Sequence, residues 1–175
     1  MKKAPDNPKQ QSFEQPTRKF VQPSMNTPDM KHYKSSEWNF ALDIPKRWHS
    51  MPPQCTNSPY EVMRFVSKEN GSHVLIVFRE IHDSKQTLQQ VSDAVQKILA
   101  GHGFGNFVPG NTAIGSRPVL TLDFERQKDG ATWSCRHYFV ADDTLRYTLG
   151  FGTTNKAETF DLYDKMAKSF EFEAS

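Results

Sequence analysis

Three consecutive stretches that alternate apolar and polar residues, joined by short turns, constrain the fold of this chain most. They span residues 117–127, 132–142 and 145–153. Alternation of period two predicts strands with one apolar face each. The turns fall at Lys128-Asp129-Gly130 and at Asp142-Asp143-Thr144, and connections this short permit only antiparallel pairing. We therefore expect an antiparallel sheet at the centre of the fold.

Weaker strand signals precede these three stretches. Residues 38–44, 60–66 and 73–81 are predicted strands, and the last is apolar on both faces in its middle. Residues 104–114 are predicted as a loop or short strand. A polar, proline-rich loop is expected at residues 46–59, because prolines there would interrupt a sheet.

Two segments switch to helical periodicity. The first has Thr87 and Gln90 as a capping box, and Gly101 and Gly103 at its end. Its predicted apolar face is Leu88, Val91, Val95, Ile98 and Leu99. The second begins at Asn155 with Glu158, and its predicted buried face is Phe160, Tyr163, Met166, Ala167 and Phe170. The expected fold class is α+β, a twisted antiparallel sheet of about six strands sandwiched between helices.

The N-terminal end differs in composition from the rest. Residues 1–36 hold five of the eleven prolines, and large apolar residues there follow no period. Residues 1–37 carry seven basic and four acidic side chains, a net of +3, whereas residues 38–175 carry 15 and 16, a net of −1. We predict a disordered, basic, proline-rich tail over residues 1–36 and a single domain over residues 37–175.

Charge and hydropathy exclude several classes of protein. A net charge of +2 does not favour a nucleic-acid binder. No run approaches the roughly 18 apolar residues that a membrane span needs. Met1-Lys2-Lys3 is not followed by the apolar stretch of a signal peptide. We expect a cytoplasmic protein, or an exported one if a native signal was removed or a specialised secretion system is used.

Few residues suggest chemistry. Cys135 and His137 share one strand face and, with Asp123, are the alternative centre of an enzyme or metal site. Flanking Trp133 and Phe139 favour instead a packed core with one histidine. The glycines of residues 101–105 follow a predicted helix, so they fit a helix end better than a phosphate loop. We expect no catalytic residue, no metal and no cofactor.

Aromatic and proline residues suggest a surface for a protein partner. Exposed aromatic side chains dominate the energetics of protein interfaces. Both faces of the predicted sheet carry apolar residues, so either one helix covers each face or part of a face stays open as a groove. The predicted partner-binding residues are Trp48, Pro52, Pro53, Tyr60 and Tyr138.

Three segments together resemble one superfamily. The first segment, residues 38–48, contains in order an aromatic residue, alternating apolar residues, a proline and a tryptophan. The second, residues 115–118, leads into the predicted hairpins, and the third, residues 168–172, ends the last predicted helix. The pattern resembles PsbP-like domains, which include the photosystem II protein PsbP, the yeast Ran-binding import factor, DcrB-like lipoproteins and the Eag chaperones of type VI secretion. The resemblance spans about residues 37–173. It implies a sheet between helices and a non-catalytic binding role.

The function expected from these features is that of a non-enzymatic protein-binding adaptor or chaperone, serving a bacterial secretion system or a multi-protein complex. Its partner would be another protein, or an apolar helix of a client as for the Eag chaperones. The alternatives are a secreted effector or immunity protein, and the enzyme or metal site around Cys135 and His137. The oligomeric state stays open.

Overall fold

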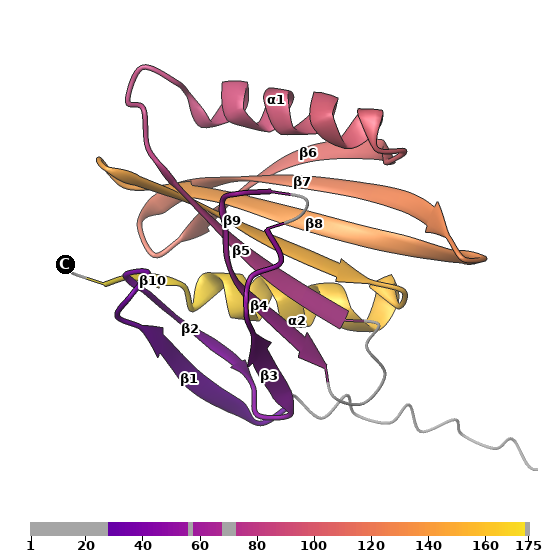
Figure 1. Ribbon diagram of the computed structural model, residues 1–175, viewed down its shortest axis with the longest axis horizontal. Coiled ribbons are helices and arrows are strands. Elements are labelled where there is room, and N and C mark those ends of the chain that lie inside the picture. Colours follow the sequence, from indigo (N-terminus) through magenta and orange to yellow (C-terminus); the bar gives the residue numbers. More distant parts are fainter. Residues whose placement is uncertain (1–27, 56–57, 68–72, 174–175) are drawn as a thin grey trace, which may run out of the picture.

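The protein consists of two antiparallel sheets and two helices (Figure 1). The structure, a computed structural model, describes residues 28–55, 58–67 and 73–173. The larger sheet has seven strands in the order β3-β4-β5-β9-β8-β7-β6, and the smaller has the order β1-β2-β10. The elements are β1 (Met30–Ser35), β2 (Phe40–Pro45), β3 (Trp48–Met51), β4 (Glu61–Ser67), β5 (His73–Ile81), α1 (Leu88–Gly101), β6 (Gly105–Ile114), β7 (Arg117–Lys128), β8 (Ala131–Ala141), β9 (Leu145–Thr153), α2 (Lys156–Lys168) and β10 (Glu171–Phe172).

The predicted hairpins form the centre of the large sheet. Strands β7, β8 and β9 pair antiparallel in sequence order. Asp129 and Gly130 join β7 to β8 and both have positive φ, 53° and 77°, as a two-residue type I′ turn requires. Gly115, with φ of 59°, opens the two-residue turn between β6 and β7. These turn residues set the register of the sheet.

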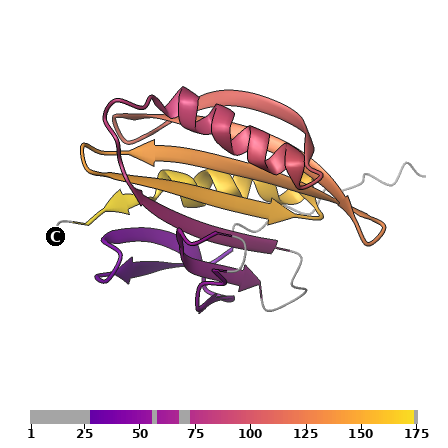
Figure 2. The same cartoon turned by 45° about the horizontal axis from the view of Figure 1, so that its top comes forward.

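The two helices cover opposite faces of the large sheet (Figure 2). Neighbouring residues of a strand point to opposite faces of the sheet, and cross-strand partners point to the same face. His137 and its partner Gly150 therefore lie on one face, and Tyr138 and its partner Leu149 lie on the other. Helix α1 packs with one face, around Leu122, Phe124 and Phe139. Helix α2 packs with the other face, and its buried residues join the larger core. The predicted sandwich of a sheet between helices is confirmed.

Both predicted helices form, with two differences in detail. Thr87 and Gln90 make the capping box at the start of α1. Ile98, predicted on the buried face of this helix, is instead 62% exposed. Asn155 makes no capping hydrogen bond with its side chain at the start of α2. Tyr163, Met166, Ala167 and Phe170 are buried as predicted.

Two short edge strands depart from the prediction. Strand β1 falls within the residues assigned to the tail, so the folded part begins earlier than residue 37. Only Met30 and Tyr33 of β1 pack against the core, and Tyr33 meets the ring of Phe65 edge-on at 4.8 Å. An edge strand with so few buried residues shows no period-two pattern. Strand β3 lies in the predicted loop of residues 46–59. Residues 1–27 of the predicted tail lie outside the described residues.

Candidate functional site

The residues of the enzyme or metal hypothesis do not form one site. Cys135 and His137 lie on the face of β8 that meets α1, whereas Asp123 pairs with Arg136 on the opposite face. Burial raises the pKa of Cys135 to about 12, with the nearby charge of Glu125 adding to the effect, so the thiol stays protonated. Within the described residues, no group of three His, Cys, Asp or Glu side chains could hold a metal ion.

His137 is packed as a neutral aromatic side chain. Its ring meets Phe124 edge-on at a centroid distance of 4.8 Å and also contacts Phe78 and Phe139. Burial lowers its pKa to about 4. Its Nδ1 atom is buried with no hydrogen-bond partner in the part of the chain that the structure describes. A charged imidazolium is therefore strongly disfavoured at this position.

Asp123 and Tyr138 belong to a network that holds α2 on the sheet. Asp123 accepts two hydrogen bonds from Arg136, at 2.6 Å from Nε and 2.7 Å from Nη2. Arg136 donates a third bond, of 2.9 Å, to Asp164 of α2, and its guanidinium lies 4.6 Å from the ring centre of Phe160. Tyr138 also donates to Asp164. With these groups mutually satisfied, the arrangement is structural.

Two of the five predicted partner-binding residues are not on the surface. Tyr138 is 2% exposed and Trp48 is 5% exposed. Trp48 is buried because β3 places its side chain on the core side of the sheet, where the indole stacks on His73. Pro52, Pro53 and Tyr60 are exposed, and their role in binding stays a prediction.

Part of the sheet face beside α1 has neither of the two described helices over it. Helix α1 packs over β6, β7 and β8, and the same face continues across β9, β5 and β4. Half-buried apolar side chains follow this continuation. We call them the apolar platform, and its residues are Val66, Val74, Ile76, Phe78 and Trp133.

Two glycines of β9 make the apolar platform flat. A Cβ atom built on Gly150 would lie 3.2 Å from Phe78 and 3.0 Å from Nε2 of His137. One built on Gly152 would lie 3.4 Å from Val74 and 3.7 Å from Trp133. Side chains of the two neighbouring strands therefore lie across β9. The surface is therefore apolar and flat at Gly150 and Gly152, and the next side chain of β9 on this face is Thr148, opposite Phe78.

Helix α1 and the connection before β4 border the apolar platform. Gln89 lines a pocket together with residues of β6, so it lies on the β6 side of α1. Ile98 follows Gln89 by nine residues, about two and a half helical turns, and therefore lies on the opposite side of the helix, toward β9. On the other side, the buried Glu61 carboxylate accepts a bond from Arg64 at 2.9 Å and one from the Gln54 amide at 3.0 Å. Arg64 lies opposite Ile76, so these bonds tie residues 52–54 to the rim of the platform.

Sequence reasoning left open whether part of a sheet face stays uncovered as a groove, but it did not identify the platform residues, although two signals for them were present. Residues 73–81 are apolar on both faces, and the next strand in the sheet carries Gly150 and Gly152 at alternate positions. A strand apolar on both faces needs cover on both sides. Here α1 covers only the part of its face formed by β6, β7 and β8, and β5 lies outside that part. The strand order was needed to see this.

None of the described helices is long and apolar enough to cross a membrane. No protein-family model matches the chain, and no curated protein sequence is similar enough to count as a match.

Solved structures do resemble the chain. Cyanobacterial PsbP (CyanoP) from Synechocystis sp. PCC 6803 is 13% identical with a TM-score of 0.66, over 82% of this chain and 92% of that one. LpqN of Mycobacterium tuberculosis, described as involved in cell envelope biogenesis, is 12% identical with a TM-score of 0.58, over 83% and 91%. A Bacteroides thetaiotaomicron protein is 9% identical with a TM-score of 0.61, over 83% of this chain and 49% of that one. The seven-stranded sheet between α1 and α2 is therefore a PsbP-like fold.

Proposed function

We propose that this protein is a non-enzymatic protein-binding adaptor or chaperone and that the apolar platform is its contact surface. The observation that carries the proposal is the half-buried apolar face beside α1, continued by Ile98 at 62% exposure. Contiguous exposed apolar surface on a folded protein marks interaction sites. Cys135 and His137, the alternative centre, are neutral and packed, which supports binding over catalysis.

The partner should present apolar side chains and little charge. The five platform residues carry no ionisable group. The charges that border them are paired, Arg64 with Glu61 and, beyond Phe78, Arg146 with Glu80. An apolar or amphipathic helix of a client protein suits such a flat surface, because it can lay several side chains along it at once. Burying aromatic residues such as Phe78 and Trp133 would supply most of the binding energy.

The cellular setting is part of the same proposal. The structural likeness to LpqN, a protein of cell envelope biogenesis, supports service in an envelope or secretion complex. The alternative setting is that of a cytoplasmic adaptor that hands a client to such a complex. Both settings use the same surface, so a test of the platform does not depend on the compartment.

Site-specific photo-crosslinking in the native cell tests the proposal. A photoreactive amino acid replaces Ile98 in one form of the full chain and Val108 in another. Val108 is the matched control, because it is 61% exposed and lies opposite Asp123, on the face of the sheet that is turned away from the platform. We expect a discrete adduct from position 98 that position 108 does not give.

A second variant connects the adduct to the apolar platform. Ile98→Glu, a change on an exposed side chain, should abolish co-purification of the crosslinked protein, whereas Val108→Glu should retain it. Identical adducts from both positions, or no adduct from position 98, would contradict the proposal.

A further inference from the structure

Strand β6 is an end strand of the large sheet, and no other described strand pairs with its outer side. The two-residue turn at Gly115-Ser116 makes Ile114 and Arg117 the first hydrogen-bonded pair, so alternate residues before Ile114 turn their N–H and C=O groups outward. Pro109, Asn111 and Ala113 hold these outward positions, and all three are exposed. A proline is tolerated here because its missing N–H would face outward.

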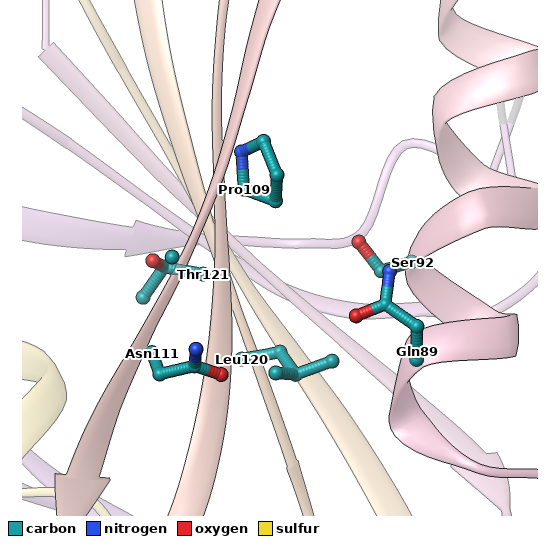
Figure 3. A pocket seen from close by; sticks show the side chains of 7 residues that line it. Gln89, Ser92, Pro109, Asn111, Leu120 and Thr121 are labelled. Carbon is teal, nitrogen blue, oxygen red and sulfur yellow. The ribbon is translucent and has the colours of Figure 1, made fainter.

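Beside this edge lies a small pocket between β6 and α1 (Figure 3). It has a volume of about 220 Å³ and is lined by Gln89, Ser92, Pro109, Gly110, Asn111, Leu120 and Thr121. In the close-up, Ser92 and Gln89 extend from α1 toward the strands. Asn111 lies opposite Leu120, whose side chain packs with α1, so the Asn111 amide is on the same side of the sheet.

The pocket contains polar groups that the fold itself does not use. Ser92 is only 3% exposed. Its hydroxyl makes no hydrogen bond with any other described residue, and the same holds for the side-chain amide of Asn111. The lining carries no charged side chain. The Ser92 hydroxyl is not among the buried unpartnered atoms of the described residues, so it is accessible from the pocket and can bond a ligand there.

We propose that β6 accepts an extended peptide segment of a partner protein as an eighth strand, and that a small uncharged polar side chain of this peptide enters the pocket. The outward groups of Asn111 and Ala113 would bond its main chain. Ser92 and the Asn111 amide would bond its side chain. The neutral lining selects against a charged residue there, since no group would compensate its desolvation.

Pro109 argues for a foreign peptide over a second copy of this chain. In a two-fold pairing centred on Asn111, Pro109 of each copy would face Ala113 of the other. The missing N–H would then weaken the ladder at both ends. A short peptide meets Pro109 only once and can end before it. The expected docking window is therefore Gly110 to Ile114.

The experiment uses the full chain as bait for a phage-displayed library of random 12-residue peptides. Enriched peptides are synthesised, and their affinities are measured for the wild type and two variants. Ala113→Pro removes an outward N–H, whereas the matched Ala113→Ser retains it. We expect Ala113→Pro to weaken binding by about tenfold or more and Ala113→Ser to leave it unchanged, as the loss of one main-chain bond plus a steric clash requires.

Chemical modification of the peptide gives a test that does not depend on folding of a variant. N-methylation at alternate residues should abolish binding, whereas N-methylation at the residues between them should be tolerated. Equal sensitivity at every residue, or amide shifts on binding that fall away from residues 109–113, would overturn the proposal. So would a library that yields no peptide enriched over an unrelated bait.

Other occupants of the edge have distinct outcomes, each of which overturns a foreign peptide. A concentration-dependent dimer that Ala113→Pro abolishes would assign the edge to a second copy. Amide shifts at residues 109–113 on deletion of residues 1–27 would assign it to the N-terminal segment of the same chain. The crosslinking test at position 98 is independent, so this inference and the proposed function can fail separately.

Discussion

The buried imidazole of His137 should make the protein sensitive to mild acid. Burial lowers its pKa to about 4 in the folded chain, whereas an unfolded chain has a histidine pKa near 6.5. Between these values the unfolded state binds more protons, so the free energy of unfolding falls as the pH falls. The stability is present above about pH 6.5 and is lost progressively down to about pH 4.

The size of the loss follows from the two pKa values. The difference between the two pKa values corresponds to about 3 kcal/mol when the pH is below both. Between pH 7 and pH 5 the expected part is about 2 kcal/mol. This is a large share of the roughly 5–15 kcal/mol by which folded proteins are usually stable.

Urea unfolding at pH 7 and pH 5 measures this loss in the wild type and in His137→Leu. Leucine fills a similar space and cannot be protonated. We expect the wild type to lose about 2 kcal/mol more than the variant between the two pH values, because other titrating groups are common to both. His102→Gln, at the exposed C-terminal cap of α1, is the control and should behave as the wild type.

An equal loss of stability in the wild type and in His137→Leu would refute the reasoning. A direct measurement covers the case in which the variant does not fold. The ring signals of His137 in the folded wild-type protein should not titrate until the pH approaches about 4. Titration of this ring near pH 6.5 would show that the imidazole is hydrated, contrary to its packing.

Three further predictions concern the core and the sheet. Arg136→Met should lower the free energy of unfolding by about 2 kcal/mol in chemical denaturation, because it leaves two partly buried carboxylates without their common partner. An aromatic disulfide reagent should react with one thiol per native chain, that of exposed Cys55, and with two thiols in denaturant. The reason is that Cys135 is packed and protonated in the folded chain. Two fast-reacting thiols in the native state would contradict this. Gly150→Ala should lower the thermal midpoint since its new methyl would crowd two rings, whereas Gly101→Ala, which meets no atom within 4 Å, should leave the midpoint unchanged or raise it.

Local chemistry explains the elements that sequence reasoning predicted well. The type I′ turn at Asp129-Gly130 and the capping box of Thr87 with Gln90 each involve only a few consecutive residues. Alternation along β7, β8 and β9 likewise needs no knowledge of distant contacts. The opposite holds for β1 and β3, which are short edge strands whose residues acquire their burial from other strands.

The candidate site depended almost wholly on such distant contacts. Trp48 and Tyr138 have the side chains of interface residues, yet β3 and α2 place both in the core. Ile98 fits the apolar period of α1, yet it is exposed on the flank of α1 where no other described helix packs. The exposure of an aromatic or aliphatic side chain depends on which other residues pack over it. Those residues are distant in the sequence, so the local sequence does not predict the exposure.

By itself, then, the sequence determined the strands of the central hairpins and their pairing, the two helices and the α+β class, since each follows from backbone preferences and periodicity over a few residues. Only the tertiary structure decided that the glycines of β9 lie under Phe78 and Trp133, that α1 stops short of β5, and that no other described strand pairs with the outer side of β6. These features arise where strands distant in sequence become neighbours. The surfaces proposed for binding are the places where that packing is incomplete.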